Sequence, residues 1–366
     1  MPDQRSVAEN PKRGMHHTGP PSGLADNGRA DKGKGARMRA IIWGVAGLTA
    51  IYSGYWFVGA SAARTAIESQ LAGLQAQGLV AETSDLSLRG FPNRFDLTLT
   101  DPRFGDPQAG VEWAAPFAQV FSLSYKPWHL IAALPPEQTI TLPGDVITLR
   151  SDSFKGSLVM EPGTALPLDR MNIAVDALEA NASGGPIAGA ETLRIATRQE
   201  PLAENAHEYA FLATNLRPDP GLMALFASAG LPDVIARANL GGVARFDGPI
   251  RPAAPESLPV LTGLSVDQAD LVWGDLTVTA KGELRPDAAG LAEGTLTVEV
   301  TGWRVLPAAL QAAGVIQPDA LFVVTAMLSG MAQQDGTPET LTLPLSFANG
   351  MTVLGTWPLG PAPRLR

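Results

Sequence analysis

Apolar and polar residues alternate along much of the chain, which is the pattern of a β-strand with one buried and one solvated face. The clearest example is DLSLRGFPNRFDLTLT at residues 85–100, where two alternating runs flank a turn of Gly, Pro and Asn. Two such runs around a turn predict an antiparallel hairpin. The apolar positions of this hairpin are Leu86, Leu88, Phe95, Leu97 and Leu99.

The same alternation recurs in residues 171–177, 276–281 and 296–301. Asn349-Gly350 lies between two further apolar runs, 341–347 and 351–357, and this dipeptide is the strongest short-range signal of a two-residue hairpin turn. Because each strand has one apolar and one polar face, the pattern favours an antiparallel sheet over a parallel one. We expect about 12–18 strands.

Three segments, 221–238, 305–313 and 319–333, are rich in Ala, Leu and Met and are interrupted by Gly and Pro. They predict about three short helices that cover an end or a face of the sheet. The expected fold class is mainly β, a β-rich α+β arrangement: an elongated, curved antiparallel sheet with a few short helices, preceded by one N-terminal transmembrane helix. A Trp in VEWAAPF and another in LVWGDLTV hint that the domain 79–366 has two similar sheet halves, joined near 200–250.

An uncharged stretch of 24 residues, 40–63, precedes the alternating region. As a helix it would reach about 36 Å, and the hydrocarbon layer of a membrane is about 30 Å thick. Residues 38–63 are therefore predicted to form a transmembrane helix. A buried core helix would rarely run this long without a charge. A signal peptide is the stronger alternative, because Ala60-Ser61-Ala62 is an A-x-A cleavage pattern, but its apolar region is usually about 7–15 residues, so a retained anchor is favoured.

The flanks of this stretch indicate its orientation. Residues 1–39 carry eight basic and four acidic residues, a net charge of +4, whereas the remainder carries 19 basic and 32 acidic residues, a net charge of −13. Positively charged flanks stay in the cytoplasm, so the N-terminus is expected inside and residues 64–366 outside. The expected membrane-anchor flank residues are Arg37, Arg39, Trp43, Tyr55, Trp56 and Arg64.

Two shorter segments adjoin the predicted span. Residues 1–37 are dominated by Gly, Pro, Asn, Asp, Lys and Arg, which predicts a disordered cytoplasmic basic tail. The alternative is that the natural chain begins at Met38. Residues 64–78 predict an amphipathic linker helix, in which Ile67, Leu71 and Leu74 share one face and Gly78 ends the helix.

Candidate catalytic chemistry is sparse. The absence of cysteine excludes a disulfide framework, a thiolate zinc site, an iron–sulfur cluster and a cysteine nucleophile. Beyond the tail the histidines are His129 and His207, far apart in sequence, and no nucleotide-binding, nucleophile-elbow or zinc-protease motif is present. We expect no catalytic residue, no metal, no cofactor and a non-enzymatic protein. A hydrolase with a carboxylate or histidine site assembled by the fold is the third hypothesis.

Charge also bears on the choice of ligand. A domain with a net charge of −13 repels phosphates, so a nucleic-acid partner is not expected. Arg89, Arg94 and Arg103 gather around the first hairpin, with several Asp residues beside them. The simpler interpretation is ion pairing at the strand edge, and the more specific one is contact with a small anion or a lipid headgroup.

Several local sequences resemble the bacterial family called domain of unknown function 2125. They are GYWF in the apolar stretch, DLSLRGFPNRFDLTLTDPRF at 85–104, WAAPF at 113–117, SYKPWHLI at 124–131, EPGTALPLDR at 161–170 and FANGMTVLGTWPLGPAPRLR at 347–366. The resemblance covers nearly everything from about residue 38 onward and implies a membrane-anchored bacterial protein, without catalytic residues to carry over. In their alternating sequence pattern the strands are more distantly similar to AsmA-type envelope proteins, which implies an elongated sheet that holds lipid acyl chains.

The leading hypothesis is a single-pass bacterial inner-membrane protein whose periplasmic domain binds or passes lipid-like molecules, or supports envelope assembly. Its expected partners are the lipid bilayer, through the transmembrane helix, and a lipid-like ligand. The physical reason for expecting a lipid-like ligand is that the sheet face is too large for about three short helices to cover, which would leave an apolar groove. The alternative is a membrane-tethered protein-interaction scaffold whose sheet folds on itself and leaves no groove.

Overall fold

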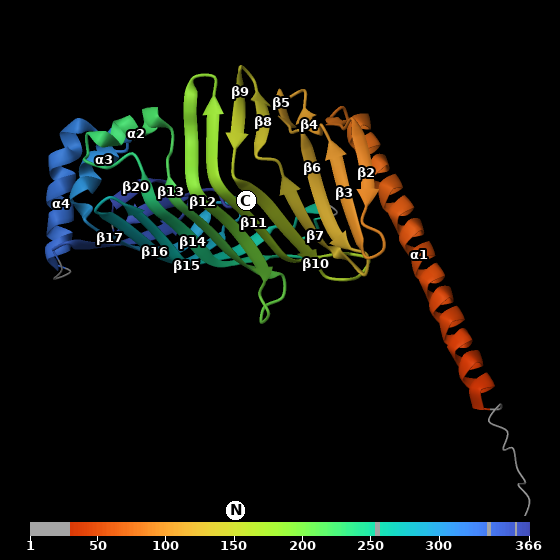
Figure 1. The fold of residues 1–366 in the computed structure, drawn as a ribbon. Coiled ribbons are helices and arrows are strands. Elements are labelled where there is room, and N and C mark those ends of the chain that lie inside the picture. Colours follow the sequence, from red (N-terminus) through yellow and green to blue (C-terminus); the bar gives the residue numbers. More distant parts are fainter. Residues whose placement is uncertain (1–29, 253–256, 335–337, 356) are drawn as a thin grey trace, which may run out of the picture. The chain divides into compact units, whose positions relative to one another are not determined.

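The computed structural model describes residues 30–252, 257–334, 338–355 and 357–366. The chain divides into two compact units, Met1–Gly54 and Tyr55–Arg366. The second unit is built on one twenty-stranded antiparallel sheet, with short helices at its C-terminal end (Figure 1). The predicted fold class, a large open antiparallel sheet with a few short helices and an N-terminal apolar helix, is confirmed.

Helix α1 (Ala30–Ala76) is a single helix of 47 residues. Among the described residues it is the one helix long and apolar enough to cross a membrane. Up to Gly54 its large apolar side chains, such as Trp43, are exposed. The predicted transmembrane segment and linker helix are consecutive parts of α1, which corrects the prediction of disorder for residues 30–37. An existing helix extends over these residues without a new nucleus, and Ala, Lys and Arg favour this, although Gly33 and Gly35 do not. The rest of the predicted tail lies outside the described residues.

Ten short strands form the first part of the sheet. They are β1 (Val80–Glu82), β2 (Asp85–Arg89), β3 (Arg94–Thr100), β4 (Arg103–Asp106), β5 (Val111–Ala114), β6 (Phe117–Leu123), β7 (Lys126–Leu134), β8 (Glu137–Leu142), β9 (Asp145–Arg150) and β10 (Ser153–Met160). In the β2–β3 hairpin Leu86 lies opposite Leu99 and Leu88 opposite Leu97. The hairpin predicted for residues 85–100 is thereby confirmed.

These ten strands are five longer strands that are each broken once. On one side of the break β2, β3, β6, β7 and β10 are neighbours, and on the other side β1, β4, β5, β8 and β9 are. Three of the breaks fall at Asp101-Pro102, Ala115-Pro116 and Pro135-Pro136. Proline has no N–H to give to a strand ladder, so it ends regular pairing. The breaks raise the number of strands above the expected range.

The later strands follow one another as antiparallel neighbours in chain order. They are β11 (Leu168–Ala182), β12 (Gly185–Gln199), β13 (Ala206–Leu216), β14 (Ile235–Phe246), β15 (Leu261–Trp273), β16 (Leu276–Pro286), β17 (Ala292–Thr301), β18 (Thr340–Ala348), β19 (Met351–Leu354) and β20 (Trp357–Pro361). β11 joins both sets of earlier strands, through β10 and β9. β13 and β14 are hydrogen-bonded neighbours, so the sheet is continuous through residues 200–250, and the two similar halves stay a prediction.

The hairpin predicted at Asn349-Gly350 is confirmed. Ala348 lies opposite Met351, and the two turn residues between them have φ values of 53° and 73°. Positive φ at both central residues is the type I′ geometry, whose twist matches that of the flanking strands. Asn and Gly are the residues that adopt this geometry at least cost.

The register aligns apolar residues into an unbroken row across thirteen strands, from β2 to β18. Residues that lie directly opposite each other in an antiparallel pair point to the same face of the sheet. The row consists of Leu88, Leu97, Val120, Ala132, Gly156, Ile173, Ile195, Phe211, Leu240, Ala269, Ala280, Val298 and Leu343. We call the side of the sheet that carries this row the apolar face.

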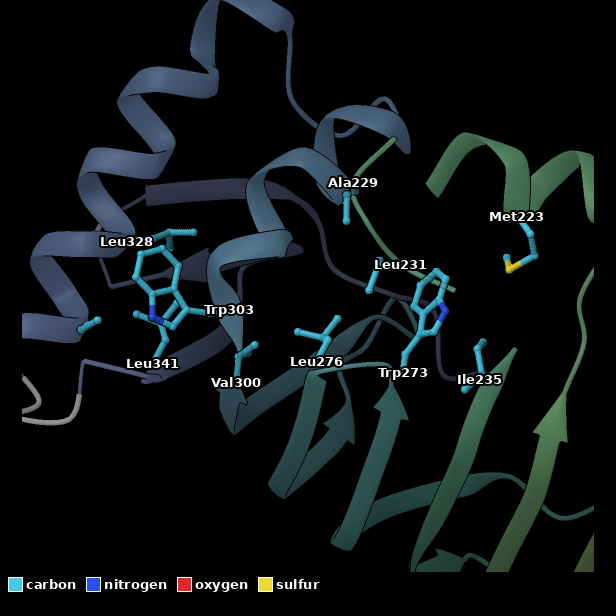
Figure 2. Close-up of a cluster of buried hydrophobic side chains, with 12 residues drawn as sticks. Met223, Ala229, Leu231, Ile235, Trp273, Leu276, Val300, Trp303, Leu328 and Leu341 are labelled. Atoms are coloured by element: carbon cyan, nitrogen blue, oxygen red, sulfur yellow. The ribbon is translucent and has the colours of Figure 1, made fainter. Parts of the chain in front are cut away.

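Three helices cover the C-terminal end of the apolar face: α2 (Pro220–Ala227), α3 (Leu306–Ala312) and α4 (Leu321–Gln334). Their apolar side chains form one buried cluster with β15 to β18, and Figure 2 shows the Trp303 indole between Leu328 of α4 and Leu341 of β18. The indole N–H of Trp273 donates to the carbonyl oxygen of Pro232 at 2.6 Å. This core fixes the helices to the sheet.

The helix predicted over residues 221–238 is wrong in its second half. Helix α2 ends at Ala227, and β14 begins at Ile235. Between them Gly230 has a φ of 80°, a left-handed conformation, and Pro232 follows. A left-handed glycine and a nearby proline are ordinary ends of a helix. The helices predicted at 305–313 and 319–333 are confirmed as α3 and α4.

Candidate functional site

The central part of the apolar face is the candidate functional site. In the part of the chain that the structure describes, the two clusters of fully buried apolar residues draw their buried members from α2 onward. The apolar residues of β7 and β10 to β14 in the row are only partly buried. Leu240 of β14 keeps 38 % of its surface exposed, whereas Leu341 of β18, beneath the helices, keeps 0 %. Along this row the face is therefore covered at its helical end and only partly covered over β7 and β10 to β14, and we call this partly exposed stretch of the row the open centre. Other residues of the same face are buried there, because Val175 of β11 is 2 % exposed and Ala213 of β13 is 0 % exposed.

The opposite end of the apolar face is closed by the part of α1 that belongs to the second unit. Trp56 is only 5 % exposed and stacks on Phe95 of β3, with ring centroids 5.7 Å apart. The Trp56 indole N–H donates to the carbonyl oxygen of Arg94 at 2.8 Å. Farther along α1, the Gln75 amide donates to the carbonyl oxygen of Ala81 at 2.7 Å. The open centre thus lies between residues 55–76 of α1 on one side and α2 to α4 on the other.

The other face of the sheet is polar. On it Arg194 pairs with Asp176, Arg198 with Glu208, and Arg237 with Asp270. Burial alone would raise the pKa of Asp270, but hydrogen bonds donated by Asn239, Arg237 and Gln268 together lower it. The three arginine side chains are between 39 and 66 % exposed, as expected on a solvated surface, whereas the Asp270 side chain is 9 % exposed. The sheet is therefore amphipathic as a whole.

Two titratable groups of β13 lie on the apolar face. His207 is 4 % exposed, its ring meets Phe246 edge to face with centroids 6.4 Å apart, and burial lowers its pKa. Burial also raises the pKa of Tyr209, whose hydroxyl donates to the carbonyl oxygen of Ser265 at 2.9 Å. Both groups are therefore neutral at pH 7 and compatible with an apolar surface.

The structure does not bring the two candidate histidines together. His129 of β7 lies opposite Val159, on the polar face, whereas His207 lies opposite Ala244, on the apolar face. They are also four strand spacings apart, roughly 19 Å across the sheet. Among the described residues no group of three or more His, Asp or Glu side chains is placed to hold a metal ion.

The three arginines singled out in the sequence do not form one site. Arg94 pairs with Asp96, and Arg103 pairs with Glu112 at 2.9 Å and with Glu82 at 3.2 Å. Arg89 is exposed at the end of β2. Arg94 and Arg103 stand nine residues apart along one interrupted strand, up to roughly 30 Å. For Arg94 and Arg103 the geometry matches ion pairing at the strand edges.

The predicted membrane-anchor residues lie along α1 in different surroundings. Arg37, Arg39 and Trp43 are exposed in the first unit. In the second unit, the Tyr55 hydroxyl donates to the carbonyl oxygen of Ser124 at 2.8 Å, and Arg64 pairs with Glu68 at 2.8 Å. Trp56 is the exception, because its ring packs inside the protein against the first hairpin. An aromatic residue near the end of an apolar stretch therefore serves here to fasten the helix to the sheet.

A cavity adjoins the apolar face, and no sequence pattern indicates it. It has a volume of about 470 Å³ and lies between α2 and the paired ends of β11 and β12. Met223 and Leu231 in its wall also belong to the buried cluster under the helices. Three charged residues, Glu179, Arg217 and Asp233, complete the lining. These come from distant parts of the chain, so no local motif marks them.

The fold and the site define a class of protein: an open, amphipathic antiparallel sheet behind an N-terminal helix that is a candidate membrane span. The chain belongs to a bacterial family described as "uncharacterized protein conserved in bacteria (DUF2125)", whose model matches residues 56–363. No curated protein and no solved structure matches the chain. The family resemblance seen in the sequence is thereby confirmed.

Proposed function

We propose that this protein is a non-enzymatic, membrane-anchored protein of the bacterial cell envelope that binds or passes lipid-like molecules along its apolar face. Helix α1 anchors it in the inner membrane with the N-terminus in the cytoplasm, and the sheet lies in the periplasm. The observation that carries the proposal is the unbroken apolar row from Leu88 to Leu343, which is open over its centre. The excess of basic residues before the span supports the orientation.

The dimensions and energies of the face suit an acyl chain. From β7 to β13 the uncovered face spans four strand spacings, roughly 19 Å. Each buried methylene contributes about 0.8 kcal/mol, so ten half-buried methylenes contribute about 4 kcal/mol. That is enough for reversible retention and too little for permanent capture, which is what a protein that passes its ligand onward needs.

Site-specific photo-crosslinking in cells tests the proposal. A benzoyl-phenylalanine is placed in the full-length protein at Ile195, on the apolar face, or at its neighbour Ala196, which points to the polar face. We expect lipid adducts, found by mass spectrometry, at position 195 and not at position 196. No adduct at position 195, or equal adducts at both positions, would refute lipid binding by this face.

The proposed topology is tested separately. A reporter enzyme that is active only in the periplasm is fused to the C-terminus of the full-length protein. We expect activity in intact cells, because the sheet domain follows a single span whose N-terminal flank carries the basic residues. An inactive but stable fusion would show that the sheet lies in the cytoplasm.

A membrane-tethered interaction scaffold is the second candidate function. It is favoured by exposed apolar side chains on the covering helices: Leu225 of α2 is 51 % exposed and Phe322 of α4 is 82 % exposed. α3 and α4 contain no charged residue. If the benzoyl-phenylalanine at Ile195 yields only protein adducts of discrete mass, this candidate replaces the lipid-binding one.

A further inference from the structure

The cavity between α2 and the sheet combines an apolar wall with charged groups. Met223, Ala227 and Leu231 supply apolar wall, and Glu179, Arg217 and Asp233 supply the charges. Its volume of about 470 Å³ is near the lower end of the 300–1,000 Å³ usual for small-ligand sites. It is therefore large enough for a polar headgroup with the start of its chains and too small for a whole two-chain lipid.

Among the residues that the structure describes, the three charged side chains of the cavity are not paired. Within the described part of the chain neither Glu179, Arg217 nor Asp233 forms an ion pair or a side-chain hydrogen bond. Elsewhere on the sheet charged side chains are commonly paired, for example Arg285 with Glu293. The charges at the cavity are therefore available to a ligand.

One strand, β12, lies between the acidic and the basic group at the cavity. Glu179 of β11 lies opposite Gly189 of β12, and Gly189 lies opposite Arg217, so the three residues stand in one row across the sheet. Arg150 of β9 continues this row on the other side of Glu179, and its guanidinium pairs with Glu137 at 3.1 Å. A Cβ at Gly189 would lie 3.9 Å from Nη1 of Arg217 and 3.2 Å from the carbonyl oxygen of Leu178. The space left by the missing side chain is where the Arg217 guanidinium passes. The row thus presents a carboxylate and a guanidinium on the same side, separated by one strand.

We infer that this cavity binds the headgroup of a zwitterionic lipid that carries a primary ammonium and a phosphate, with the acyl chains continuing onto the apolar face. Arg217 receives the phosphate, and Glu179 with Asp233 receives the ammonium. The inference rests on the proposed lipid-binding function and names the class of lipid.

The charges favour this headgroup over its relatives. A headgroup with only negative charge is repelled by two carboxylates, and one without a cation leaves both of them unpaired. Carboxylates accept charge-assisted hydrogen bonds from a primary ammonium, whereas a quaternary ammonium has no N–H to donate. Guanidinium groups bind phosphate oxygens through two parallel N–H donors. A phosphoethanolamine headgroup meets all of these conditions.

A competition experiment on the full-length protein tests the inference. The protein with benzoyl-phenylalanine at Ile195 is reconstituted into nanodiscs that hold equal amounts of ethanolamine, choline and glycerol phospholipids with identical acyl chains. The headgroups of the cross-linked lipids are then counted by mass spectrometry. We expect ethanolamine adducts to exceed choline and glycerol adducts about tenfold, the effect of one charge-assisted hydrogen bond.

Matched variants assign the preference to the cavity. Glu179→Gln keeps the size of the side chain and removes its charge, so we expect the ethanolamine excess over choline to fall to near unity while the total adduct yield stays. Asp233→Asn, in a separate loop, is a second test of the same expectation. Glu204→Gln, an exposed residue outside the cavity lining, is the control and keeps the full excess.

The outcomes separate this inference from the proposed function. Abundant adducts without headgroup preference, or a preference that survives both Glu179→Gln and Asp233→Asn, would overturn the headgroup site and leave lipid binding intact. A complete absence of lipid adducts at position 195 would overturn both. An unchanged thermal midpoint of Glu179→Gln shows that a lost preference is not lost folding.

Discussion

Two leucines on the same face of the sheet are expected to tolerate truncation very differently. Leu341 of β18 is 0 % exposed within the cluster under the helices, and Leu240 of β14 is 38 % exposed over the open centre. A fully buried Leu→Ala change loses transfer energy and also leaves a cavity, so Leu341→Ala should cost about 4 kcal/mol. At position 240 solvent fills the vacated space, so Leu240→Ala should cost about 1.5 kcal/mol.

Urea unfolding of the full-length protein in detergent micelles measures this difference. Tryptophan fluorescence reports directly on the cluster, because Trp303 contributes to it beside Leu341. With a denaturant slope of about 3 kcal/mol/M, the two variants should differ in midpoint by roughly 0.8 M. Both variants carry the same α1, so any contribution of micelle-bound helix cancels.

One result of this unfolding experiment would show that the centre of the apolar face is not exposed. If Leu240→Ala lowers the midpoint as much as Leu341→Ala, then Leu240 is covered in solution, by a second copy or by another partner. The central apolar face would then be a protein interface, and it would not be available to bind acyl chains. Equal but small effects would instead mean that the helices do not pack on β18.

Three further outcomes follow from individual side chains. Leu240→Asp should lower lipid cross-linking at Ile195 at least tenfold while shifting the thermal midpoint by only a few degrees, because position 240 contacts water. The folded-state pKa of His207 lies below its unfolded value of about 6.5, so stability is lost as the pH falls through that value. The drop in melting temperature between pH 7.5 and 5.5 should therefore be smaller in the His207→Gln variant than in the unmodified protein. Asp270→Asn should cost about 1–2 kcal/mol in urea unfolding, since it weakens the hydrogen bonds from Arg237 and Asn239 at 2.6 and 2.9 Å; an unchanged midpoint would contradict that role.

Local signals in the sequence predicted the elements whose geometry is decided locally. The first hairpin and the Asn349-Gly350 turn are confirmed, because alternation and turn chemistry act over a few residues. The segment 221–238 was predicted as helix because Ala is a strong helix former, yet in β14 small side chains such as Ala238 lie on the apolar face of the sheet. Tertiary pairing with β13 and β15 overrode the local preference.

The candidate site depends on contacts that no local pattern specifies. Alternation predicts that each strand has an apolar side, but only the register shows that Ile195, Phe211 and Leu240 stand in one row. The cavity is still harder to predict from the sequence, because Glu179 and Arg217 stand on either side of Gly189 through an isolated bridge between β12 and the segment that follows β13. A charged residue after a strand is common, and its sequence neighbours do not indicate that it lines a cavity.

An open apolar face has a consequence for how this protein keeps its fold. At Leu240 the sheet does not gain the burial that Leu341 gains under the helices. A ligand that covers the face adds stability in proportion to RT ln(1 + [L]/Kd), about 2.7 kcal/mol when the ligand is at one hundred times its Kd. Lipid extraction should therefore lower the melting temperature of the full-length protein, and adding back a preferred lipid should restore it. Because the control positions Leu341 and Trp303 are already covered, truncating them should lower stability equally with and without lipid. Truncating Leu240 should, by contrast, lower stability more when lipid is present than when it is absent, because only bound lipid gives that side chain a contact that truncation can remove.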